Sequence, residues 1–155
     1  MIYYLDTSAL VKAYVQEDRS QEVRDLLHQS RAAEASWLYV SRLTYPETLS
    51  AITRRENRGE IAPGDARLLH SRVSADFTGP DRLYQIIEPT AAVVNDAAGL
   101  VIRHRLRGFD AVQLAGALLI FTEAGGACTL VASDRQLLAA AAAEGISILD
   151  LSTSL

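Results

Sequence analysis

The chain opens with Met1-Ile2-Tyr3-Tyr4-Leu5-Asp6-Thr7-Ser8-Ala9-Leu10-Val11-Lys12, and this stretch decides the fold class. Residues 1–5 form an apolar run that is too short for a helix and rich in β-forming residues, so they predict a buried strand. The polar residues 6–8 offer side chains that cap helices, and the helix that they introduce covers residues 9–14. A buried strand that leads directly into a capped helix indicates an α/β protein.

The same alternation continues along the chain. Four more strands are predicted, at residues 37–40, 83–87, 129–132 and 146–149. Helices are predicted at residues 20–31, 44–59, from 63 through 73, 93–101, 111–122 and 135–143. About five strands and about seven helices predict a three-layer α/β/α sandwich around a mostly parallel sheet.

Length and composition narrow the class of protein. The 155 residues are about one domain's worth of chain, so we expect a single domain over residues 1–155. Hydrophobic residues make up 49% and charged residues 22%, which excludes a disordered or fibrous chain. The single cysteine, Cys128, excludes an internal disulfide framework, and its apolar surroundings predict a buried thiol. No apolar stretch approaches the length of a membrane span and no signal-peptide pattern is present, so we expect a cytoplasmic location.

The charge balance argues against a protein that coats nucleic acid by bulk attraction, because 19 acidic and 15 basic residues give a net charge of −4. Lys12 is the only lysine, so the other basic residues are arginines, whose planar guanidinium suits bidentate contacts with phosphate. Genomic base composition produces the same bias. Composition alone therefore leaves the partner open.

Four carboxylates are predicted to meet at one edge of the sheet, because the carboxyl ends of parallel strands share that edge with the helices that follow them. Asp6 follows the first strand, Glu47 opens the helix after the second, and Asp134 follows the fourth. Asp110 joins them if its helix begins at the same edge. Each acid also has a simpler explanation: Asp6 and Asp134 are good N-caps, Thr44-x-x-Glu47 has the pattern of a capping box, and Asp110 can start its own helix.

Carboxylates that converge within a few ångströms repel one another, and a bound divalent cation removes that penalty. Hard oxygen ligands without a histidine or cysteine partner favour Mg²⁺ or Mn²⁺ over zinc. Such a cation polarises a phosphoryl oxygen and activates water, so hydrolysis of a phosphodiester is the natural reaction. The three histidines, His28, His70 and His104, lie in predicted helices and are expected to have surface or packing roles.

Four segments carry a resemblance to a known family. They are Tyr4-Leu5-Asp6-Thr7-Ser8-Ala9-Leu10-Val11-Lys12, Ser41-Arg42-Leu43-Thr44-Tyr45-Pro46-Glu47, Leu106-Arg107-Gly108-Phe109-Asp110-Ala111-Val112-Gln113-Leu114-Ala115 and Leu130-Val131-Ala132-Ser133-Asp134-Arg135-Gln136-Leu137. In order and spacing the chain resembles the PIN-domain ribonucleases, and within them the toxins of VapBC type II toxin–antitoxin modules. The resemblance extends from residue 3 to about residue 150.

The resemblance implies a PIN-like fold and a metal-dependent endoribonuclease that arrests growth by cleaving cellular RNA, with Mg²⁺ or Mn²⁺ as its cofactor. Asp6, Glu47 and Asp110 match the three most characteristic acids of the family, and Asp134 matches a fourth, more variable one. All four are therefore predicted catalytic and metal-binding residues. Ser8 matches a small hydroxyl residue close to the pocket, which implies that it orients a ligand, and a helix N-cap is its alternative role.

The resemblance also implies three kinds of partner: a VapB-type antitoxin that blocks the acidic pocket, an RNA substrate and a second copy in a homodimer. An arginine of the antitoxin that reached the carboxylates would displace a cation. If they border the pocket, two groups of arginines are candidates for contacts with RNA phosphates, with solvated helix faces as the alternative; they are Arg54, Arg55 and Arg58, and Arg103, Arg105 and Arg107.

The main alternative function is that of a non-catalytic PIN scaffold that binds RNA or protein. Loss of the pocket acids would be its signature, and all four acids are present. A phosphatase with Asp6 as nucleophile is disfavoured, because Ser8 occupies the position where that chemistry usually needs a second acid. A dinucleotide-binding domain is disfavoured as well, since no Gly-x-Gly-x-x-Gly follows the first strand.

Overall fold

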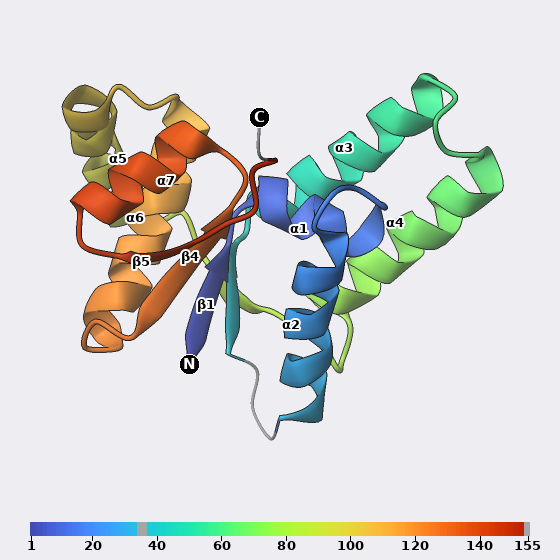
Figure 1. Cartoon of the computed structure of the whole chain (residues 1–155), viewed down its shortest axis with the longest axis horizontal. Helices are drawn as coiled ribbons and strands as arrows, with labels where there is room; N and C mark the ends of the chain where they lie inside the picture. Colours follow the sequence, from blue (N-terminus) through green and yellow to red (C-terminus); the bar gives the residue numbers. More distant parts are fainter. Residues whose placement is uncertain (34–36, 154–155) are drawn as a thin grey trace.

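The computed structural model describes residues 1–33 and 37–153, and in these residues the α/β prediction is confirmed (Figure 1). Five strands form one sheet in the order β3-β2-β1-β4-β5, and every neighbouring pair is parallel. The strands are β1 (Ile2–Leu5), β2 (Leu38–Ser41), β3 (Gln85–Ile87), β4 (Cys128–Ala132) and β5 (Ser147–Asp150).

Seven helices in the described part of the chain cover the two faces of the sheet, so the predicted three-layer sandwich is confirmed (Figure 1). One face carries α1 (Thr7–Tyr14), α2 (Ser20–Ala32), α3 (Thr44–Asn57) and α4 (Pro63–Thr78). The other face carries α5 (Ala91–His104), α6 (Gly108–Glu123) and α7 (Arg135–Ala143).

The central strands are apolar throughout because both of their faces are buried. In β1, the Tyr4 side chain packs in the core under α5, α6 and α7, whereas its neighbour Leu5 packs in the core under the first four helices. In β4, Leu130 and Val131 divide between the two cores in the same way. Successive residues of a strand point to opposite faces of the sheet, so one short strand contributes side chains to both cores.

Most predicted boundaries differ from the structure by a few residues, and two of the differences have a clear cause. Residues 108–110 were expected to separate two helices, but α6 begins at Gly108, and the break falls earlier, where Arg105 adopts a left-handed backbone conformation with φ 56°. The strand predicted at residues 83–87 is limited to Gln85–Ile87, because its pairing with β2 begins where Gln85 meets Tyr39.

A buried polar network fastens α1, α2 and α4 together, and sequence patterns did not reveal it. The Tyr14 hydroxyl donates to Asp76 Oδ2 at 2.9 Å and lies 2.7 Å from the Tyr84 hydroxyl. Arg31 donates to Asp76 Oδ1 at 2.6 Å. Asp76 is only 5% exposed, so these partners offset the cost of burying its carboxylate.

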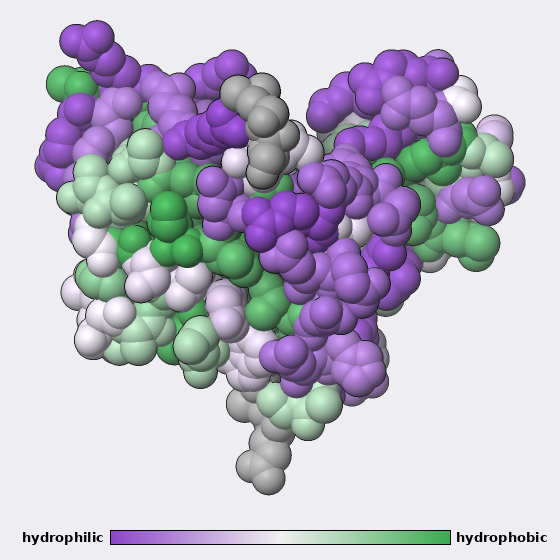
Figure 2. Space-filling view, viewed as in Figure 1, coloured by the Kyte–Doolittle hydropathy of each residue, from purple (hydrophilic) through white to green (hydrophobic). Residues whose placement is uncertain are grey.

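The two sides of the molecule differ in surface polarity. Figure 2 shows a hydrophilic surface over α1 and α2 and a more hydrophobic one beside α6, α7 and β5. Large apolar side chains at the surface include Ile148 of β5, Ile102 of α5 and Phe109 of α6. Within the described residues, no helix is long and apolar enough to cross a membrane.

Gly116 provides the first prediction. A Cβ atom at this position of α6 would collide with the hydroxyl of Tyr4, which is fully buried in β1. The substitution Gly116→Ala is therefore expected to lower the free energy of unfolding by about 1–3 kcal/mol. Gly99 of α5 has open space around it, so Gly99→Ala is expected to raise the same quantity by about 0.5–1 kcal/mol. Urea unfolding curves measure both, and equal stability of the two variants would contradict the close approach of α6 to β1.

Candidate active site

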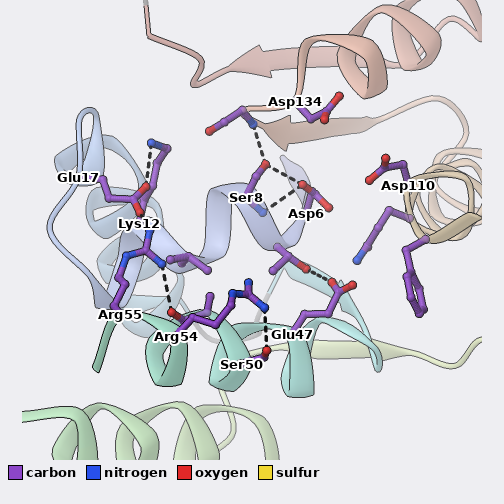
Figure 3. A pocket seen from close by; sticks show the side chains of 16 residues that line it. Asp6, Ser8, Lys12, Glu17, Glu47, Ser50, Arg54, Arg55, Asp110 and Asp134 are labelled. Carbon is purple, nitrogen blue, oxygen red and sulfur yellow. Dashed lines mark hydrogen bonds and ion pairs between the residues drawn. The ribbon is translucent and has the colours of Figure 1, made fainter. Parts of the chain in front are cut away.

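The four predicted carboxylates line one pocket of about 480 Å³ (Figure 3). Asp6 directly follows β1, and Asp134 comes two residues after β4. Glu47 lies in the first turn of α3 and Asp110 in the first turn of α6. Because β1 stands between β2 and β4, the segments that leave these three strands meet at one edge. The structure thus brings together all four acids.

Asp6 is held by the residue two positions along the chain. Its Oδ2 atom accepts from the Ser8 backbone N–H at 3.1 Å and from the Ser8 hydroxyl at 2.6 Å. The Ser8 hydroxyl also accepts from the backbone N–H of Ser133 at 2.8 Å and thereby ties the end of β4 to the start of α1. Asp6 itself is the N-cap of α1, so the N-cap alternative for Ser8 is wrong.

Two acids combine capping with a place in the pocket. Asp6 caps α1, and Asp134 caps α7 with its Oδ1 atom, which accepts from the Leu137 N–H at 2.8 Å. Both side chains also line the pocket. The capping explanation and the functional one are therefore compatible at these positions.

Glu47 and Asp110 do not cap their helices. The capping box predicted for Thr44 and Glu47 is wrong, because the N-cap of α3 is Leu43 and no side chain caps that end. Glu47 accepts a hydrogen bond from the Thr7 hydroxyl instead, which turns its carboxylate toward α1. The first turn of α6 likewise has no side-chain cap, so Asp110 is not used in that way.

The acidic surroundings change the proton affinities of two carboxyls. Burial raises the pKa of Asp6, and Glu47 adds to the rise, while hydrogen bonds from Ser8 and from the Thr7 backbone oppose it. Burial also raises the pKa of Asp110, as do Asp134 and Asp6, and Arg107 opposes this. The folded protein therefore favours a proton or another cation at this edge of the sheet.

The donor set fits a hard divalent cation by its chemistry, since it consists of carboxylate oxygens whose charge is incompletely compensated. In residues 1–33 and 37–153, however, no three Asp, Glu, His or Cys side chains already stand together as a ligand cluster. A cation would have to draw these carboxylates toward one another.

The three arginines of the first group, Arg54, Arg55 and Arg58, have different surroundings. Arg54 lines the acidic pocket, where it donates to Ser50 Oγ at 2.8 Å (Figure 3). Arg55 also lines the pocket, but it forms an ion pair with Glu17, which in turn accepts from Lys12 Nζ at 3.3 Å. Arg58 pairs with Glu60 at 2.7 Å and is not among the pocket residues.

The second arginine group is divided as well. Arg107 precedes α6 and borders an apolar hollow that shares Glu47, Phe109 and Asp110 with the acidic pocket. Arg105 is exposed at the end of α5, outside both pockets, and its backbone carbonyl accepts from Gln136 at 2.8 Å. Arg103 pairs with Glu144 at 2.6 Å.

Two of the histidines and the single cysteine have the surface or packing roles that the sequence predicted. His104 packs against Glu144, with 2.6 Å between its Nε2 atom and the carboxylate, and His70 lies 3.2 Å from the Thr53 hydroxyl. Cys128 is buried, and burial raises the pKa of its thiol to about 11.

Sequence patterns missed several pocket residues. Thr7, Lys12, Glu17 and Gln113 line the pocket together with the acids. The one available signal was spacing, because Gln113 lies one helical turn after Asp110 on the same face of α6.

An α/β/α sandwich with an acidic pocket where its parallel strands end is common to several classes of enzyme that act on phosphate esters, and comparison with known proteins identifies the class here. The family model described as "PIN domain" matches residues 3–144. Ribonuclease VapC45 and Ribonuclease VapC49, from two strains of Mycobacterium tuberculosis, are each 36% identical to the chain over 122 residues, which are 77% of this chain and 76% of the relative. The chain belongs to the PIN-domain family and, within it, to the VapC ribonucleases.

Solved structures show the same fold. PAE2754 from Pyrobaculum aerophilum superposes with a TM-score of 0.63 at 18% identity, over 96% of this chain and 83% of that one. VapBC2 from Rickettsia felis, bound to a DNA fragment from its promoter, gives a TM-score of 0.61 at 15% identity, over 97% and 98%. FitAcB from Neisseria gonorrhoeae gives 0.61 at 15%, over 96% and 97%.

The raised pKa of Asp6 predicts how stability changes with pH. A carboxyl whose pKa rises on folding binds its proton more tightly in the folded state, so the free energy of unfolding falls as the pH rises above the unfolded-state value of about 3.9. An Asp6→Asn variant keeps a capping side chain without the charge. It should be more stable than the wild type at pH 7, and the difference should shrink as the pH falls toward 3.

Asp150 is the matched control for this prediction. Hydrogen bonds from Ser152 lower the pKa of its carboxyl, so its contribution has the opposite sign and is lost as the pH falls. Asp150→Asn should therefore not stabilise the protein at pH 7. Chemical unfolding in a pH series measures both variants, and a wild type more stable than Asp6→Asn at pH 7 would refute the predicted sign.

Proposed function

We propose that the chain is a single PIN-like domain over residues 1–155 that hydrolyses phosphodiester bonds within RNA in a reaction that depends on Mg²⁺ or Mn²⁺. One observation carries the proposal: Asp6, Glu47, Asp110 and Asp134 line one pocket in a chain that belongs to a family of ribonucleases. The curated relatives are named as ribonucleases, and the pocket retains an acid at every position that the family resemblance assigns.

Asp6, Glu47, Asp110 and Asp134 are the residues that would hold the cation. When bound, it would polarise a phosphoryl oxygen and lower the pKa of a water molecule. Ser8 orients the Asp6 carboxylate through two hydrogen bonds, and Thr7 orients Glu47. These neighbours hold the two carboxylates in the pocket before any cation arrives.

Basic side chains beside the pocket support binding of the RNA backbone. Arg54 borders the acids, and among the described residues its side chain donates only to the Ser50 hydroxyl, so its guanidinium keeps donors for a phosphate. Arg107 borders the neighbouring hollow, which shares Glu47 and Asp110 with the acidic pocket, and its charge opposes the rise in the pKa of Asp110. We assign Arg54 and Arg107 to direct phosphate contacts and Arg105 to longer-range attraction of RNA, whereas Glu17 compensates the charge of Arg55.

The partners follow from the same pocket. We propose a VapB-type antitoxin that inhibits the protein by placing a basic side chain among the four carboxylates, because a guanidinium satisfies clustered carboxylates as a cation does. A homodimer is supported by exposed apolar side chains on α5, Val94 and Ile102. The protein would act in the cytoplasm, where cleavage of cellular RNA arrests growth.

The cleavage assay uses purified full-length protein that is free of antitoxin, a pool of cellular RNA, and Mg²⁺, Mn²⁺ or EDTA. Discrete products are expected with either cation and none with EDTA. Asp6→Asn and Asp110→Asn should each lower the cleavage rate at least about 100-fold, as expected for lost metal ligands. Metal-independent cleavage, or full activity of Asp6→Asn, would refute the proposed chemistry, whereas RNA binding without cleavage would indicate a non-catalytic scaffold.

Arg54 and Arg58 provide a matched pair for the phosphate contacts. Both lie at the end of α3, but only Arg54 lines the pocket, whereas Arg58 is paired with Glu60. Arg54→Ala should weaken RNA binding. It should also lower the slope of the logarithm of the binding constant against the logarithm of the salt concentration by the amount that corresponds to about one phosphate contact. Arg58→Ala should change neither the affinity nor the slope. Filter binding to RNA in EDTA over a salt series gives the comparison. Equal effects of the two substitutions would show that Arg54 acts only through net charge.

A further inference from the structure

One buried amide joins three elements that carry pocket acids. Gln113 of α6 is 2% exposed. Its Nε2 atom donates to the Thr44 hydroxyl of α3 at 3.0 Å, and its Oε1 atom accepts from the Tyr4 hydroxyl of β1 at 3.2 Å. Thr44 and Tyr4 are fully buried as well, so water does not replace either hydrogen bond.

Each residue of this hydrogen-bonded group lies two or three residues along the chain from a pocket acid. Gln113 comes three residues after Asp110 on α6, and residues three apart share a helix face. Thr44 comes three residues before Glu47 on α3. Tyr4 comes two residues before Asp6 on β1. The amide therefore lies at the wall of the pocket, where it connects three elements that carry or directly precede three of the four acids.

We propose that Gln113 is a positioning residue, whose hydrogen bond to Thr44 sets the separation between Glu47 and Asp110 across the acidic pocket. The inference rests on the proposed metal-dependent function, because that separation matters when one cation must draw the two carboxylates together. The bond from Tyr4 holds the amide in the rotation that presents its N–H group to Thr44.

The hydrogen bond has this role because α3 and α6 have little other contact. Among the described residues, α6 packs mainly against α5 and α3 mainly against α4, whereas α3 and α6 do not pack extensively against each other. Losing the Thr44 hydroxyl would leave a buried amide N–H without its acceptor, and the two helices would shift to relieve that cost. An amide side chain can both donate to Thr44 and accept from Tyr4, whereas glutamate lacks the N–H donor and leucine lacks both groups.

Positioning matters here because the carboxylates are not already gathered as a metal site in the described part of the chain. The cation must provide the free energy that closes the remaining distances. A wider separation of α3 and α6 raises the free energy needed to bring the carboxylates together, so it weakens cation binding even though every acid is still present.

The test compares two isosteric substitutions on one helix. Thr44→Val removes the acceptor of the Gln113 amide. Thr48→Val removes an equally buried hydroxyl one turn later, whose one hydrogen bond within residues 1–33 and 37–153 goes to the backbone oxygen of Thr44 at 2.7 Å. Mn²⁺ binding is measured on the full chain by titration calorimetry. We expect Thr44→Val to raise the dissociation constant about 10-fold, as for residues that orient metal ligands, and Thr48→Val to leave it unchanged.

Two further variants make the test specific. Thr44→Ser restores the hydroxyl and should restore wild-type Mn²⁺ affinity. Gln113→Leu should weaken binding as Thr44→Val does, and the double variant should be no weaker than either single one, because both remove the same interaction. Wild-type affinity of Thr44→Val, or equal losses in Thr44→Val and Thr48→Val, would overturn the proposal.

Hydrogen–deuterium exchange in the absence of metal separates this inference from the proposed function. Thr44→Val should accelerate exchange in the first turns of both α3 and α6, whereas Thr48→Val should affect α3 alone. This result would support the link between the helices whether or not the wild type binds Mn²⁺. A wild type that binds no Mn²⁺ would refute only the proposed metal dependence. Unchanged exchange in α6 would overturn the link itself.

Discussion

Repulsion between like charges is the constraint on which this edge of the sheet depends. Asp6, Glu47, Asp110 and Asp134 line one pocket, and folding must hold them there against their mutual repulsion. Burial raises the pKa of Asp6 and of Asp110, and repulsion from the neighbouring acids adds to both rises. Any cation that binds the folded chain and not the unfolded one recovers this free energy as binding energy. The site is thus destabilised in a way that favours its ligand.

Local sequence signals predicted the strands and the helices, because each depends on neighbours in the chain, whereas the four acids were assigned from the expected edge of the sheet and from the family resemblance. An apolar run followed by Asp6 predicts a strand and a cap without reference to other segments. The hydrogen bonds of Glu47 depend on Thr7, which lies 40 residues away, and no local pattern indicates that contact. The capping box failed for this reason: the tertiary contacts of Thr44 and Glu47 replaced the local ones.

The arginines show the same limit in another form. Arg54 and Arg55 face different surroundings because an α-helix turns about 100° per residue, and Arg58 is the C-cap beyond the end of α3. Arg54 faces the acids, Arg55 meets Glu17, and Arg58 meets Glu60. Clustering in the sequence therefore indicated a basic region, whereas only the fold separates the guanidinium that remains available for phosphate from those whose charge is already compensated.

The acids differ in how the fold holds them, and this difference divides the pocket into two parts. Asp6 and Asp134 follow adjacent strands, cap the next helices, and are linked through Ser8 and Ser133, so the sheet itself fixes their positions. Glu47 and Asp110 stand on α3 and α6, which the sheet does not register against each other. Backbone hydrogen bonds fix the relative positions of the strands. A side-chain hydrogen bond must fix the relative position of α3 and α6. A buried amide suits that task because its oxygen accepts from the Tyr4 hydroxyl of β1 while its N–H group donates to the Thr44 hydroxyl of α3.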